Sequence, residues 1–99
     1  MDPFNAELKA RLVRYCAMDS QSDMDSAASP TTEFQHAILG LMVEELTGIG
    51  ATEVTKTSYG TVIATIAGTV EGPTIGFLAH VDTAPQFNTS GVKPRLVER

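Results

Sequence analysis

The sequence predicts an α/β fold in which two helices are followed by three strands. Residues 3–48 contain two stretches whose apolar side chains recur at helical spacing. After Gly50 the pattern changes to short runs rich in Thr, Val and Ile, bounded by glycine and turn residues. Two of these runs are apolar at nearly every position, which is typical of strands covered on both faces. Two helices do not suffice to cover such a sheet, so we expect the chain to be part of a larger α/β sheet.

The first helix is predicted to begin after Asp2 and to end near Met18. Asp2 is a suitable N-cap, and Pro3 suits the first helical position. One apolar stripe follows at helical spacing, made of Phe4, Leu8, Leu12, Tyr15 and Cys16. The polar residues 19–29 that come next predict a solvated loop.

The second helix is predicted to begin at a capping box of Thr32 and Gln35. Gly48 and Gly50 provide its C-terminal stop. Its buried side is expected to consist of Phe34, Ile38, Leu41, Met42 and Leu46.

The three strands are predicted from composition and from turn residues. Thr52–Thr57 contains Glu53 and Lys56, which favours an edge strand. Residues 61–67 and 74–79 are almost wholly apolar, and the second of these runs is expected to be a central strand. From Val81 onward, proline, asparagine and glycine residues predict a long loop.

Composition excludes several classes of function. The chain has 7 basic and 12 acidic residues, a net charge of −5, and no basic run, which argues against a nucleic-acid partner. Its apolar stretches are shorter than the roughly 20 residues of a membrane-spanning helix, and no signal peptide is visible. The single cysteine excludes an intrachain disulfide. These features favour a cytoplasmic protein with no membrane partner.

The motif with the most chemical content is His80-Val81-Asp82, at the end of the predicted central strand. Open α/β sheets place ligands at this position. A zinc ligand is a neutral imidazole whose second nitrogen needs an acceptor, and an aspartate two residues later can supply it. The alternative is a structural histidine that is hydrogen-bonded to a nearby carboxylate. The residues alone leave both interpretations open.

Several stretches together resemble the amino-terminal part of the peptidase T family, the tripeptide aminopeptidases among the M20 zinc metallopeptidases. The strongest is the run from Thr74 to Pro85, which contains His80-Val81-Asp82-Thr83. The others, in the family's order, are Arg14-Tyr15, residues 19–23, Asp25-Ser26, residues 44–46 and Val92-Lys93-Pro94.

This resemblance implies a two-zinc aminopeptidase that removes the N-terminal residue from tripeptides. His80 matches a zinc ligand, and Asp82 matches the aspartate of the catalytic centre that orients this ligand. The family has an aspartate where this chain has Gln86, and its remaining ligands and general base lie beyond the matched part. Residues 1–99 are therefore expected to be the N-terminal fragment of a three-layer α/β/α catalytic domain. The fragment would lack the lid or dimerisation domain and be inactive alone.

Two other functions remain open at this stage. One is a non-catalytic α/β binding or assembly module whose strand edges pair with another chain. The other is a different M20 peptidase or amidohydrolase, because these enzymes share the His-x-Asp motif. In every case, the apolar strands predict self-association of the isolated chain.

Other residues that could carry chemistry are better explained structurally. His36 has no ligand at i+4 and is expected to be an ordinary surface histidine. Cys16 lies on the apolar stripe and is expected to be buried rather than nucleophilic. No catalytic role is assigned to Glu44-Glu45. Loop, cap or solvated roles are expected for Ser20, Ser22, Asp19, Asp23, Asp25, Lys93 and Arg95.

Overall fold

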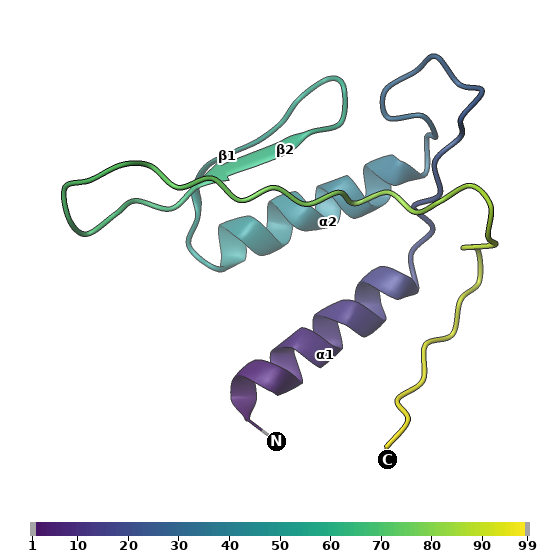
Figure 1. Ribbon diagram of the computed structural model, residues 1–99, viewed down its shortest axis with the longest axis horizontal. Helices are drawn as coiled ribbons and strands as arrows, with labels where there is room; N and C mark the ends of the chain where they lie inside the picture. The colour runs from purple at the N-terminus through teal and green to yellow at the C-terminus, as the bar shows by residue number, and fades with distance from the viewer. Residues whose placement is uncertain (1, 99) are drawn as a thin grey trace.

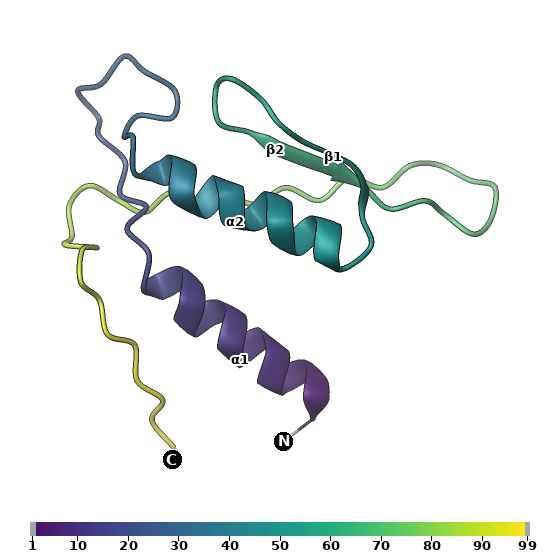
Figure 2. The ribbon, with the colours of Figure 1, turned by 180° about the vertical axis from the view of Figure 1, so that it is seen from behind.

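A computed structural model describes residues 2–98 of the chain. It contains α1 (Pro3–Cys16), α2 (Gln35–Gly48), β1 (Thr52–Lys56) and β2 (Val62–Thr65), shown in Figure 1. The two strands form an antiparallel hairpin against one side of α2, and α1 lies on the other side of that helix (Figures 1 and 2). The predicted α/β class is confirmed. Neither helix within residues 2–98 has the length and apolar character needed to cross a membrane.

Helix α1 begins as predicted but does not bury its apolar stripe. The carboxylate of Asp2 accepts a hydrogen bond from the backbone N–H of Phe4 at 2.7 Å, and Pro3 occupies the first helical position. No side chain of α1 is buried, and those of Phe4 and Leu12 are 65% and 64% exposed. Cys16 is also exposed, so its predicted burial is wrong. Apolar packing therefore does not hold α1 in place.

Charged groups attach α1 to α2 instead. Glu45 of α2 accepts hydrogen bonds from Arg11, Arg14 and Tyr15 of α1, including one from Arg14 Nε at 2.7 Å. The Glu45 side chain is only 14% exposed. Burial opposes its ionisation, but the hydrogen bonds from Tyr15 and Arg14 and the two positive charges outweigh burial, so the pKa of Glu45 lies below its usual value. We call these four residues the Glu45 cluster.

Helix α2 supplies most of the small core. Ile38 and Leu39 are buried, together with Ala51 just after the helix, whereas the other predicted core positions are half-buried or exposed. The predicted capping box forms only in part. Gln35 Oε1 accepts from the backbone N–H of Thr32 at 3.3 Å, but the Thr32 hydroxyl donates to the carbonyl of Gln21.

The hairpin confirms the first two predicted strands, with shorter bounds. Thr55 pairs with Ile63 and Lys56 with Val62. The turn is closed by a hydrogen bond from Thr57 N to Thr61 O at 2.8 Å. Ile63 is 51% exposed, so the predicted coverage of β2 on both faces is wrong in this structure.

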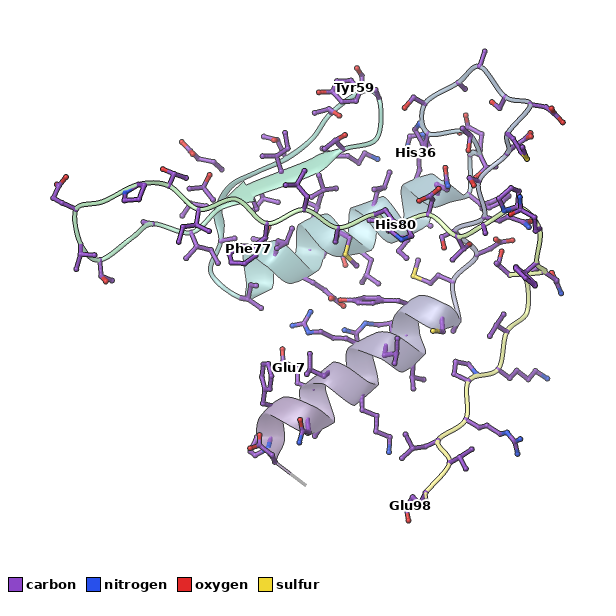
Figure 3. The ribbon with its side chains drawn as sticks, in the orientation of Figure 1. Glu7, His36, Tyr59, Phe77, His80 and Glu98 are labelled. Atoms are coloured by element: carbon purple, nitrogen blue, oxygen red, sulfur yellow. The ribbon has the colours of Figure 1, made fainter. Side chains whose placement is uncertain are left out.

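The third predicted strand, residues 74–79, does not form. This stretch has no ladder partner within residues 2–98, and every residue from 65 to 80 is exposed. Phe77 and Leu78 are 94% and 97% exposed, and Figure 3 shows Phe77 on an extended run of chain. A strand needs a neighbouring backbone to satisfy its N–H and C=O groups, and no other segment of residues 2–98 supplies one here.

The accessible surface area also indicates that the apolar runs lack a layer that would cover them. The accessible area is 7956 Å², whereas a folded monomer of this mass exposes roughly 5,400 Å². The excess supports two expectations that stay predictions, namely further strands of a larger sheet and self-association of the isolated chain.

The hairpin turn depends on Gly60, which lies against Pro30. Pro30 belongs to the loop of residues 22–31, which we call the 22–31 loop. Gly60 has φ +88°, and a Cβ built there would lie 2.8 Å from Cδ of Pro30. We expect Gly60→Ala to lower the free energy of unfolding by about 2 kcal/mol, because it combines left-handed backbone strain with overlap against a rigid ring. Urea unfolding followed by circular dichroism measures this change.

Gly40→Ala is the matched control for this substitution. Gly40 lies inside α2 with no atom within 4 Å of a built Cβ. Alanine is therefore expected to stabilise the chain by up to about 1 kcal/mol there. Equal effects of the two variants would contradict the role assigned to Gly60.

Candidate metal centre

His80 and Asp82 contact each other as the sequence predicts. The Nδ1 atom of His80 lies 3.0 Å from Oδ1 of Asp82 and 2.9 Å from the Asp82 backbone oxygen. Both oxygens are acceptors, so Nδ1 must carry the ring proton in the neutral imidazole. The lone pair is then on Nε2. The His80 side chain is 86% exposed, so this lone pair is accessible to a metal ion.

Asp82 also changes the acid–base behaviour of the ring. The hydrogen bond to the Asp82 carboxylate, followed by the hydrogen bond to its backbone and its negative charge, raises the pKa of His80 above the usual value. The imidazolium form is therefore held more tightly than in a free histidine. A metal ion that binds Nε2 would compete with the second ring proton, which binds at the same atom.

The chain that follows Asp82 pairs with residues 19–22, where the sequence predicted a solvated loop. Gln21 and Thr83 form a parallel bridge, with hydrogen bonds from Thr83 N to Ser20 O at 3.0 Å and from Ser22 N to Thr83 O at 2.9 Å. Thr89 donates to the carboxylate of Asp19 at 2.7 Å. Residues 19–22 form no helix or strand, as predicted, but Ser20 is buried and the others are half-buried, so the predicted solvation is wrong. We call these residues the 19–22 segment.

The 19–22 segment is in turn fixed to α2. Among residues 2–98, the buried polar side chains are Ser20 and Gln35, at 3% and 5% exposure. Gln35 Nε2 donates to the carbonyl of Ser20 at 3.0 Å. The sequence reasoning missed this contact, although a glutamine one turn before Ile38 and Leu39 places a polar group on the inward face of the helix.

A cavity of about 290 Å³ lies beside Asp82. It is open to solvent and is lined by residues 22–31, the first turns of α2, the hairpin turn and residues 81–82, but not by His80. Its lining is mixed, with the apolar side chains of Ile38 and Leu39 and the polar side chains of Ser22 and Thr61. Such a lining suits a small ligand that has both polar and apolar parts.

The described residues offer one candidate metal ligand, not a complete set. Across residues 2–98, no group of three or more His, Cys, Asp or Glu side chains converges on one point. His36 lies near Lys56, with Nδ1 to Nζ at 3.3 Å, which agrees with its predicted surface role. A catalytic zinc site has three protein ligands. The geometry of His80 and Asp82 therefore fits one ligand and its orienting carboxylate.

Comparison with known proteins gives one consistent relationship, although no protein-family model matches the chain. The chain is 44% identical over 95 residues to peptidase T of Geobacillus thermodenitrificans (strain NG80-2), and 45% identical over 95 residues to peptidase T of Staphylococcus carnosus (strain TM300). These alignments cover 94% and 93% of this chain but 23% of each relative. The chain thus resembles part of peptidase T and spans about a quarter of the length of the relatives that it matches.

Proposed function

We propose that this chain is part of a zinc-dependent peptidase that removes the N-terminal residue from tripeptides. The observation that carries the proposal is the pair His80–Asp82, which leaves Nε2 of an oriented, exposed imidazole free to bind a metal ion. The similarity to proteins named peptidase T over 94% of this chain supports the same conclusion. A cytoplasmic location belongs to the proposal as well.

The residues of this chain would have two roles. His80 would donate the Nε2 lone pair to one of two zinc ions, and Asp82 would keep the proton on Nδ1 and hold the ring plane. When bound, zinc polarises a carbonyl group and lowers the pKa of a water molecule. The remaining ligands and the general base would come from outside residues 2–98.

The cavity beside Asp82 supports a small substrate. Its volume of about 290 Å³ is close to the lower end of ligand pockets and would accommodate part of a short peptide. Tripeptides are the substrate class that we propose, because the chain resembles the tripeptide aminopeptidases.

A chimera tests the proposal. The 95 residues of the Geobacillus thermodenitrificans relative that align with this chain are replaced by the matching residues of this chain. We expect the purified chimera to hydrolyse tripeptides, to lose this activity on dialysis against a chelator, and to regain it with zinc. The unmodified relative is the control, and circular dichroism shows whether the chimera folds. A folded chimera without zinc-dependent hydrolysis would contradict the proposal.

A further inference from the structure

The orientation of His80 depends on the peptide group between Asp82 and Thr83. Its carbonyl oxygen accepts from His80 Nδ1 at 2.9 Å, and its N–H donates to the carbonyl of Ser20 at 3.0 Å. This peptide is planar and trans, so its C=O and N–H point in opposite directions. Fixing the N–H on Ser20 therefore fixes the direction of the carbonyl that receives the His80 proton.

The carbonyl of Ser20 is itself held in place by α2. It accepts from the buried side chain of Gln35, and the neighbouring carbonyl of Gln21 accepts from the Thr32 hydroxyl at 2.9 Å. Both donors lie at or just before the first turn of α2. A continuous set of hydrogen bonds thus runs from the start of α2, through the 19–22 segment, to the ring of His80.

The side chain of Gln21 contacts the loop that follows Thr83 in the sequence. Its amide nitrogen lies 2.6 Å from the carbonyl oxygen of Phe87, 3.0 Å from that of Pro85 and 3.5 Å from that of Ala84. One amide group therefore gathers three carbonyls of the loop directly after the His-x-Asp motif. Without this donor, the carbonyls of Pro85 and Phe87 would lose their side-chain partner. The 19–22 segment would then hold Thr83 only through backbone hydrogen bonds and the hydroxyls of Ser20 and Ser22.

We propose that Gln21 is a positioning residue of the metal centre. It holds residues 83–87 against the 19–22 segment, so that the Asp82–Thr83 peptide and the Asp82 carboxylate meet Nδ1 of His80. The inference rests on the proposed function, because the orientation of His80 matters for catalysis only where Nε2 binds a metal ion. The contacts that carry it are independent of any metal.

The test determines which ring nitrogen of His80 carries the proton. It uses the whole ¹⁵N-labelled chain without metal. At a pH where the imidazole is neutral, the ring nitrogen shifts give the ratio of the Nδ1–H form to the Nε2–H form. We expect the Nδ1–H form to dominate in the natural chain. In Gln21→Glu, which keeps the side-chain shape but replaces the donor by an acceptor, the ratio is expected to fall about fivefold. Hydrogen exchange at the Thr83 amide is expected to accelerate in the same variant.

Gln86→Glu is the matched control, because it introduces the same charge at an exposed residue of the loop that Gln21 contacts. It is expected to leave the ratio unchanged. If Gln21→Glu does not fold, Gln21→Met removes the donor without adding a charge and carries the same expectation. An unchanged ratio in a folded Gln21 variant, or an equal change in Gln86→Glu, overturns the inference.

A zinc measurement separates this inference from the proposed function. In the chimera described above, the Gln21 variant is expected to bind zinc more weakly than the parent chimera. If the ratio of ring forms changes in the isolated chain but the parent chimera binds no zinc through His80, then the proposed function fails and the positioning role of Gln21 stands. If the parent chimera binds zinc but the ratio is insensitive to Gln21, the positioning role fails alone.

Discussion

His80→Ala in the chimera is expected to lower kcat/KM for tripeptides by at least about a thousandfold, because it removes the proposed zinc ligand and no neighbouring side chain replaces it. Among residues 2–98, no other metal-ligating side chains gather with His80 into a group of three or more. The rate is measured with excess zinc, and bound zinc is counted after gel filtration. The variant is expected to retain less zinc than the parent chimera.

The control is His36→Ala, which removes the other histidine of the chain. His36 lies near Lys56 and Glu33, at 3.3 Å and 4.0 Å, so its loss is expected to leave kcat/KM unchanged. Equal losses in the two variants would mean that either substitution disturbs the fold. Full activity of His80→Ala would show that His80 is not a ligand of the proposed metal centre.

Asp82→Asn is expected to have a smaller effect than the loss of the ligand itself. The amide oxygen can still accept from Nδ1, and the Asp82 backbone oxygen still does so at 2.9 Å, but the negative charge is gone. We expect zinc affinity at neutral pH to fall by about 10–100-fold. Because Asp82 raises the pKa of His80, the zinc affinity of the natural chain is expected to begin to decline at a higher pH on acidification than that of the asparagine variant. Zinc titrations between pH 5 and 8, roughly the range in which histidine titrates, measure both effects.

The sequence predicted the contacts that join residues close together in the chain. The Asp2 cap spans two residues, and so does the His80–Asp82 pair. The edge strand β1 followed from its composition, which includes Glu53 and Lys56. In these cases the relevant energies are local, so a short window of residues contains the physical information.

The failures concern burial and long-range pairing. The apolar run 74–79 has the composition of a central strand, but a strand forms only beside another backbone, and the rest of residues 2–98 provides none. The contact between Ser20 and Thr83 joins residues 63 positions apart, and both are polar residues of a kind common in loops. Periodicity carries no information about such a pair, which explains why the 19–22 segment was predicted to be solvated.

The Glu45 cluster is expected to keep α1 helical. Helix α1 has 14 residues and none is buried, whereas isolated helices shorter than about 12–15 residues are marginal in water. Its attachment to α2 depends on the carboxylate of Glu45, which Arg11, Arg14 and Tyr15 contact. We expect Glu45→Gln to release α1 and let it unfold. Because α2 also has 14 residues, the helical circular dichroism signal at neutral pH would then approach half of its natural value.

Acid is expected to act on the natural chain as the substitution does. The pKa of Glu45 in the folded chain lies below its ordinary value of 4.5, so its contribution to stability is present above that value and is lost as the pH falls through the folded pKa. A stepwise loss of helical signal below about pH 4.5 is therefore expected in the natural chain and not in Glu45→Gln. Glu44→Gln is the control, because it removes the same charge from the exposed neighbouring residue and is expected to keep both the signal and the acid step. A Glu45→Gln chain with full helical signal at neutral pH would show that α1 does not depend on the cluster.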